Sequence, residues 1–208
     1  SLTNDPLIKG NAVARYSSAN NEKTGHFDVN IGWKKWALVT SFSSNDYGNL
    51  RMGTDGPSEY KLPYHVERIS GIDQVVENED PFVQNPSGYS QQNLMQKVRF
   101  RPNENWDFEY GFHYSETTEY GRFDRHLRTR NGRPRYAKWS YGPQKWMMNN
   151  LKITNSSSNA LYDEMTIRLA QQFFEESRID RSLNDDEERN RIEQVDAYSA
   201  NLDFAKSV

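Results

Sequence analysis

The sequence predicts an all-β fold, an antiparallel up-and-down meander of about eight strands. Three observations carry this prediction: apolar and polar residues alternate along the chain, aromatic residues are frequent while aliphatic ones are scarce, and short connections alternate with long ones. The chain has 208 residues, of which 35% are hydrophobic and 13% aromatic. A soluble core of this size normally carries more Leu, Ile and Val, and disordered chains are also poor in aromatic residues. The composition therefore fits strands that have only one apolar face.

The alternation is clearest over residues 106–114. Its aromatic positions all share one face, and its polar positions share the other; the aromatic ones are Trp106, Phe108, Tyr110, Phe112 and Tyr114. The same period of two predicts strands over residues 27–33, 36–42, 94–100 and 198–204. Weaker patterns predict strands over residues 8–18, 145–154 and 161–174, and residues 164–172 are also compatible with a helix.

The connections between these strands alternate in length. Short turns are expected at residues 32–35, 102–105 and 155–159, and long loops at 45–90, 118–144 and 177–194; only the first hairpin, at residues 19–23, is short where a long loop is due. In a meander this alternation puts all long loops at one end. Outer-membrane β-barrels have that layout together with one apolar face on each strand. The alternative is a soluble β-sandwich or up-and-down barrel.

Composition also excludes several kinds of function. The chain has no cysteine, which rules out thiol catalysis, disulfides and cysteine metal sites. Its net charge of -3 argues against nucleic acid as a partner of the whole chain. No apolar run reaches the roughly 18 residues of a membrane helix. The four histidines form no catalytic set with nearby residues, so we expect neither an enzyme nor a resident metal or cofactor.

Several stretches resemble the barrel of Bacteroidetes-type TonB-dependent outer-membrane receptors, and most closely those of the ferric-siderophore or haem class. They are the opening Thr3-Asn-Asp-Pro-Leu7, the strand from Trp106 to Tyr114, Asn149-Asn-Leu-Lys-Ile-Thr154 and Tyr198-Ser-Ala-Asn-Leu-Asp-Phe204. The resemblance covers most of the chain, and it is one of overall texture with no sharp motif.

The resemblance implies a segment of a 22-stranded barrel in the outer membrane of a Gram-negative cell. Residues 1–208 would be a partial barrel that lacks the plug domain and the remaining strands; the start at Ser1 without Met also leads us to expect a piece of a longer protein. The family takes up a scarce nutrient through its extracellular loops, here an iron-bearing small molecule. TonB, the energy-coupling partner, binds an N-terminal part that is absent from this sequence.

The candidate ligand-binding residues lie in two of the predicted long loops. Residues 121–138 of the first loop are rich in arginine, with Asp124 as their only acid; the candidates are Arg122, Arg125, His126, Arg128, Arg130, Arg133 and Arg135. Arginine forks suit carboxylates and phosphates, such as those of a siderophore, a haem propionate or lipopolysaccharide, and His126 could ligate haem iron. The second loop contributes Tyr64 and His65. The arginines could instead pair with the acidic stretch of residues 175–193.

Two other classes of protein remain open from the sequence. A soluble all-β protein that binds a small molecule or glycan would bury the aromatic face against protein. A small complete eight-stranded membrane barrel, acting as an adhesin or enzyme, would end on an aromatic residue, but this chain ends Lys206-Ser-Val208.

Overall fold

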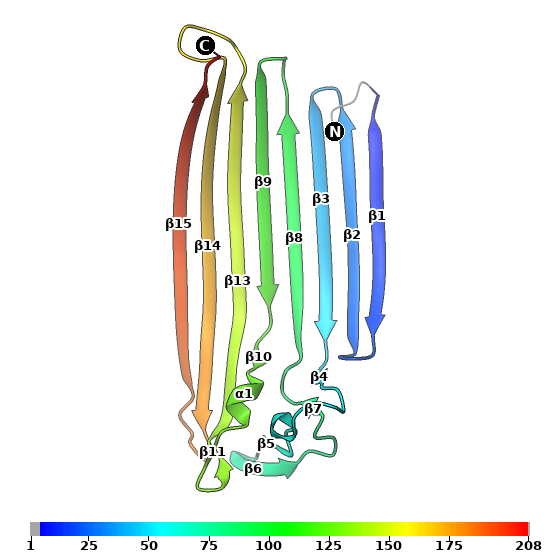
Figure 1. Cartoon of the computed structure of the whole chain (residues 1–208), viewed down its shortest axis with the longest axis vertical. Coiled ribbons are helices and arrows are strands. Elements are labelled where there is room, and N and C mark those ends of the chain that lie inside the picture. Colours follow the sequence, from blue (N-terminus) through cyan, green and yellow to red (C-terminus); the bar gives the residue numbers. More distant parts are fainter. Residues whose placement is uncertain (1–4, 208) are drawn as a thin grey trace.

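The computed structural model describes residues 5–207, so Thr3 and Asn4 of the family resemblance lie outside the described residues. The main sheet is an antiparallel meander whose long strands pair in the order of the sequence (Figure 1). They are β1 (Leu7–Ser17), β2 (Glu22–Trp33), β3 (Trp36–Tyr47), β8 (Tyr89–Phe100), β9 (Trp106–Thr117), β13 (Tyr136–Asn155), β14 (Glu164–Ser182) and β15 (Arg189–Ala205). The short strand β10 (Tyr120–Gly121) also pairs with β13. The predicted all-β meander of about eight strands is confirmed. The sheet is open rather than closed.

The register aligns the apolar residues of all eight strands on one face. A single row crosses the whole sheet through positions that pair one with the next: Ile8, Ile31, Leu38, Val98, Tyr110, Leu151, Leu169 and Ala200. Because side chains alternate along a strand, the rows two residues away lie on the same face. We call this surface the apolar face and the opposite surface the polar face.

The apolar face has two sharp borders. At the short-turn end it carries aromatic rings, with Trp36 stacked on Phe100 at 4.2 Å and Trp106 on Phe108 at 5.7 Å. At the other end a charged row follows, in which Lys145 lies 3.7 Å from Glu116 and 3.8 Å from Glu175. On β9 the band extends from residue 106 to residue 114, a length along the strand of about 26 Å at ~3.3 Å per residue.

The polar face carries paired charges at the same height. Arg99 binds Asp107 through Nε at 2.9 Å, and Lys152 lies 3.4 Å from Glu109. Arg168 pairs with Asp203 near the turn end of β14 and β15. The two faces of the sheet therefore differ in polarity.

The connections lie as expected at the two ends of the sheet. Figure 1 shows both long loops at one end, together with the β1–β2 turn and the β14–β15 connection, and the other connections at the opposite end. The first long loop contains β4 (Leu50–Arg51), the 3-10 helix η1 (Ser58–Tyr60), β5 (Tyr64–Ile69), β6 (Ile72–Glu77) and β7 (Val83–Gln84). The second contains β10, the helical turn α1 (Phe123–His126), β11 (Thr129–Arg130) and β12 (Arg133–Pro134).

Several boundary predictions were wrong, and the helical alternative for residues 164–172 is not realised. The predicted loop of residues 177–194 shrinks to residues 183–188, because its charged residues pair across β14 and β15: Arg178 lies 3.4 Å from Glu193, and Arg191 lies 3.4 Å from Asp180. Opposite charges on neighbouring strands support a ladder. The predicted tight turn at residues 155–159 is a longer connection, because β14 begins at Glu164 and not near residue 161. Residues 164–172 are strand and not helix.

The sheet has almost no interior. Within residues 5–207 the buried hydrophobic residues are Ala37, Leu62, Ala137 and Ile179. On the apolar face Leu202 is 56% exposed and Tyr198 is 74% exposed. A single uncovered layer of this size needs another medium or another protein layer against its apolar face. None of the described helices is long and apolar enough to cross a membrane.

Candidate functional site

The strongest candidate site is a basic pocket at the long-loop end of the sheet, where β13, β14 and β15 extend beyond the other strands. We call it the arginine pocket; its volume is about 830 Å³. The aromatic residues Trp139 and Tyr141 line it, and Asp180 is the acidic residue of its lining. Its guanidinium groups come from Arg125, Arg130, Arg133, Arg135, Arg178, Arg189 and Arg191. The site therefore carries a large excess of positive charge.

Strand alternation places this pocket on the polar side of the sheet. Arg178 and Asp180 follow Arg168 along β14 at even spacing, so the three share a face. Arg191 and Arg189 are their partners on β15. On β13 the register shifts between Tyr141 and Gln144, and the rings of Trp139 and Tyr141 then lie beside Asp180 and Arg178. The pocket thus opens on the side opposite the apolar band.

The second long loop supplies the other wall of the pocket. Strands β11 and β12 form a hairpin whose turn is Asn131-Gly132, with φ of 53° and 74°. Two successive positive φ angles are typical of a two-residue hairpin turn, and Asn-Gly suits them. The backbone of Arg135 accepts a hydrogen bond from the N–H of Leu183 at 3.2 Å. This contact joins the arginine loop to the connection between β14 and β15.

Three arginines lie over the aromatic rings of the pocket. The guanidinium carbon of Arg125 is 5.1 Å from the centre of the Trp139 ring, and that of Arg178 is 5.8 Å from the Tyr141 ring. Arg122 lies over both rings, at 5.2 and 5.5 Å. The two rings meet edge to face at 5.1 Å. Each cation is therefore held against a ring face, which orients its hydrogen-bond donors.

Much of the positive charge has no counter-charge in the described chain. Arg178 pairs with Glu193 and Arg191 with Asp180, but no described carboxylate forms an ion pair with Arg130, Arg133, Arg135 or Arg189. Within residues 5–207 the Nε atoms of Arg125 and Arg178 are buried and have no hydrogen-bond partner. The nearest acid to Arg125 Nε is Asp124, at 3.7 Å. Buried donors without acceptors are costly, so an incoming anion would relieve them.

The structure gathers only part of the predicted site. Arg125, Arg130, Arg133 and Arg135 line the pocket, and Arg122 lies behind its rings, paired with Asp124 at 2.7 Å. Arg128 is exposed and does not line the pocket. Three lining residues, Arg178, Arg189 and Arg191, were missed because their surroundings were interpreted as a solvated acidic loop. The signal in the sequence was a spacing of two residues, between Arg178 and Asp180 and between Arg189 and Arg191.

His126, Tyr64 and His65 lie apart from the arginine pocket. His126 is buried, and its Nε2 donates to the carbonyl of Trp139 at 3.2 Å; burial lowers its pKa. Tyr64 lines a neighbouring cavity of about 340 Å³ to which Arg133 also contributes. The Nε2 of His65 lies 2.9 Å from Glu67 on the same hairpin. None of the three presents a group to the arginine pocket.

A row of tyrosines that the sequence did not reveal leads to the pocket. Ring centres are 4.9 Å apart between Tyr47 and Tyr89, 5.5 Å between Tyr89 and Tyr120, and 6.1 Å between Tyr120 and Tyr141. Burial raises the pKa of Tyr120, so its hydroxyl stays neutral around pH 7. Tyr47 and Tyr89 lie on the polar face, at even spacing from Val39 and Lys97 on their strands. The row therefore extends the aromatic lining along that face.

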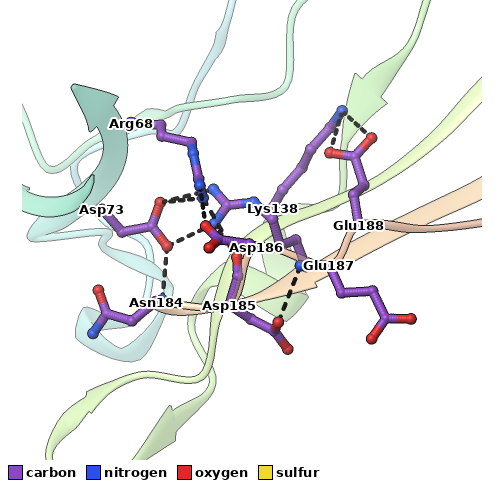
Figure 2. A network of polar contacts seen from close by, with 9 residues as sticks. Arg68, Asp73, Lys138, Asn184, Asp185, Asp186, Glu187 and Glu188 are labelled. Atoms are coloured by element: carbon purple, nitrogen blue, oxygen red, sulfur yellow. Dashed lines mark hydrogen bonds and ion pairs between the residues drawn. The ribbon is translucent and has the colours of Figure 1, made fainter. Parts of the chain in front are cut away.

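A buried ion pair fastens the first long loop to the extended strands. In Figure 2 the carboxylate of Asp73, on β6, lies among donors from β5, β14 and the β14–β15 connection. Arg181 donates to both of its oxygens, at 2.7 and 2.8 Å, and the backbone N–H of Asn184 donates at 2.7 Å. Hydrogen bonding from Arg181 holds the pKa of Asp73 below its usual value. We call Asp73 and Arg181 the hairpin clamp.

The acidic stretch is partly paired, but not with the arginines of the arginine loop. Figure 2 shows Glu188 beside Lys138, at 3.3 Å, and Asp186 binds Arg68 of β5. The alternative in which the acidic stretch pairs with the arginine loop is therefore realised only at Lys138, the last residue of that loop. Among the arginines of that loop, Arg122 and Arg125 pair with Asp124, and the others form no ion pair with a described carboxylate.

Comparison with known proteins adds no assignment: no protein family, curated protein or solved structure matches the chain. Nor does any group of three or more His, Cys, Asp or Glu residues in the described part of the chain have the arrangement of a metal site.

Proposed function

We propose that this sheet is part of the wall of an outer-membrane β-barrel, in a transporter of the TonB-dependent kind that takes up an iron-bearing nutrient. The observation that carries the proposal is the apolar band, about 26 Å long along β9, which all eight long strands share. Outer-membrane barrels present an apolar band to lipid on tilted strands, with aromatic residues at both of its borders. The aromatic end matches one of those borders, and at the other end the band stops at the charged row.

Other features support the same function. The polar face, with its paired charges, suits the interior of a barrel. The open sheet leaves β1 and β15 free to continue into further strands, as a 22-stranded barrel with a plug and a TonB-binding segment requires. The arginine pocket lies at the long-loop end, which is extracellular in such barrels. An anionic iron complex would meet Arg125, Arg133 and Arg178 there.

A pair of single-cysteine variants tests the membrane part of the proposal. Leu38 and Val39 are neighbouring aliphatic residues on opposite faces of β3, and the chain has no other cysteine. Leu38→Cys and Val39→Cys would each carry a fluorescent label in lipid vesicles that contain a brominated lipid. We expect strong quenching at position 38 and weak quenching at position 39. Equal quenching at both positions would contradict a lipid-facing wall.

Fractionation of source cells tests the transporter part. An antibody against this chain should detect a protein much larger than 208 residues in the outer membrane, more abundant under iron starvation. A soluble band of the size of this chain would overturn the transporter proposal.

One feature favours the soluble small-molecule or glycan-binding alternative. A shallow hollow of about 470 Å³ lies on the apolar face, lined by Tyr110, Leu151, Leu169 and Tyr198 among others. In a membrane barrel an acyl chain fills such a hollow, whereas in a soluble protein it holds a ligand. The quenching experiment separates the two, because only the membrane arrangement exposes Leu38 to lipid.

A further inference from the structure

We propose that the arginine pocket recognises a polyanion that carries a ring next to its oxyanions, and that it does so without a metal ion. This inference rests on the proposed function in one respect, the medium from which the ligand reaches the pocket. The pocket itself is built from loops and strand ends. It names the chemistry of the ligand that this site selects.

The charge of the pocket sets the first requirement. Seven arginines line the cavity, and Asp180 is the single acidic residue of its lining. Glu193 pairs with Arg178, but four lining arginines have no ion pair among the described residues. One negative charge on a ligand would leave most of this charge uncompensated. The complementary ligand therefore carries several carboxylate or phosphate groups.

The orphaned donors set the second requirement. Nε of Arg125 and Nε of Arg178 are buried without an acceptor in the described structure. A guanidinium binds an oxyanion through two parallel N–H groups, and because Nε is enclosed in both arginines, their terminal nitrogens would supply that fork. Because the rings of Trp139 and Tyr141 hold both groups, little side-chain entropy remains to be lost on binding. These two arginines are therefore the ligand contacts that are already in position before binding.

The rings set the third requirement. Trp139 and Tyr141 both line the cavity, and the row of Tyr120, Tyr89 and Tyr47 continues from them. A planar or cyclic group of the ligand can stack on this row while its oxyanions reach the arginines. The volume of about 830 Å³ is within the usual range for a small-molecule site.

Direct titration with three simple probes tests the inference. The full chain, refolded in detergent with 0.15 M salt and a metal chelator, is titrated by calorimetry with benzene-1,2,4,5-tetracarboxylate, butane-1,2,3,4-tetracarboxylate and benzoate. The first has four charges and a ring, the second has four charges and no ring, and the third has a ring and one charge. We expect affinity to fall in that order, at least threefold from the first to the second and more than tenfold to benzoate.

Variants locate the binding. Arg125→Gln and Arg178→Gln should each weaken binding of the ring tetracarboxylate at least tenfold, whereas Arg128→Gln, in the same loop but outside the pocket, should change it less than twofold. Arg178→Lys keeps the charge but loses the fork and should still weaken binding. Arg189→Gln removes an exposed arginine that has no ion pair in the described chain. It therefore tests the contribution of a lining arginine to binding without disturbing the fold.

Several results would overturn the inference. One is the absence of binding by the ring tetracarboxylate. Another is an equal loss in Arg128→Gln, which would indicate diffuse attraction to surface charge. Equal affinity of the two tetracarboxylates would refute the role of the rings, and a requirement for added metal would refute metal-free recognition. Quenching at Leu38 does not involve the pocket, so failure of this inference and failure of the membrane proposal are distinguishable.

Discussion

At the scale of single residues, two kinds of arginine define this molecule. Arg181 is almost fully buried and donates hydrogen bonds to Asp73, whose side chain has no exposed surface. Arg178, three residues earlier and on the opposite face of β14, keeps a buried donor free. The same side chain thus joins two loops in one case and remains available for a ligand in the other. The difference is that Asp73 accepts from both terminal nitrogens of Arg181, whereas Glu193 lies 3.4 Å from one terminal nitrogen of Arg178 and leaves its Nε without an acceptor.

The hairpin clamp makes a prediction about local stability. Asp73→Asn keeps the shape of the side chain but leaves donors of Arg181 without their charged acceptor, at a cost of about 2 kcal/mol. We expect faster amide hydrogen exchange in the β5–β6 hairpin, measured by mass spectrometry. Asp186→Asn is the matched control, because the Asp186 side chain is 93% exposed and its pair with Arg68 contributes little. Equal effects of the two variants would contradict the role of burial.

The same pair predicts a pH dependence. Because the hydrogen bond from Arg181 lowers the pKa of Asp73 in the folded state, the ionised pair stabilises the hairpin above the ordinary carboxyl pKa, about 3.9. That stabilisation is lost as the pH falls through the lower, folded-state pKa. Limited proteolysis of residues 64–77 with an acid-stable protease should therefore change little between pH 6 and pH 5 and increase below pH 4. In Asp73→Asn the acid-dependent part should be smaller.

At the scale of elements, the two faces of one strand differ in what they tolerate. Ala200 and Ser199 are small neighbours on β15, on the apolar and the polar face respectively. In a lipid-facing wall, Ala200→Arg near the middle of the band should destabilise the chain by about 2–4 kcal/mol in vesicles, and Ser199→Arg by much less. Urea unfolding in vesicles measures both. Equal losses would show that the two faces meet the same medium.

The elements also show what the sequence could and could not predict. Strands such as β9 were predictable because their aromatic residues alternate without a break. The ends of β14 and β15 were not, because Arg178, Asp180 and Arg191 have the composition of a loop and become strand only through pairing with each other. The arginine loop was recognisable from its composition. Its meeting with Arg189 and with the ring of Trp139 depends on strand register, which composition does not reveal.

At the scale of the whole molecule, the two edges of the sheet determine how the chain behaves alone. β1 and β15 each pair on one side only within the described residues, and unpaired edges recruit other strands. We expect the isolated chain in detergent to associate through these edges, as judged by light scattering. Asn11→Cys combined with Ser199→Cys should form intermolecular disulfides, whereas Leu62→Cys, a buried residue in the first long loop, should not. A purely monomeric chain would contradict this prediction.

The extra length of β13, β14 and β15 also separates two electric environments. Strand β14 continues from Glu175, in the charged row at the edge of the apolar band, to Asp180 in the pocket, about 16 Å further along. At physiological ionic strength the screening length is about 8 Å, so the separation is roughly two screening lengths. In a membrane, anionic headgroups beside the charged row would then repel an anionic ligand of the pocket only weakly. Salt should slow the capture of an anion, while the charge of the surrounding lipid should leave it nearly unchanged.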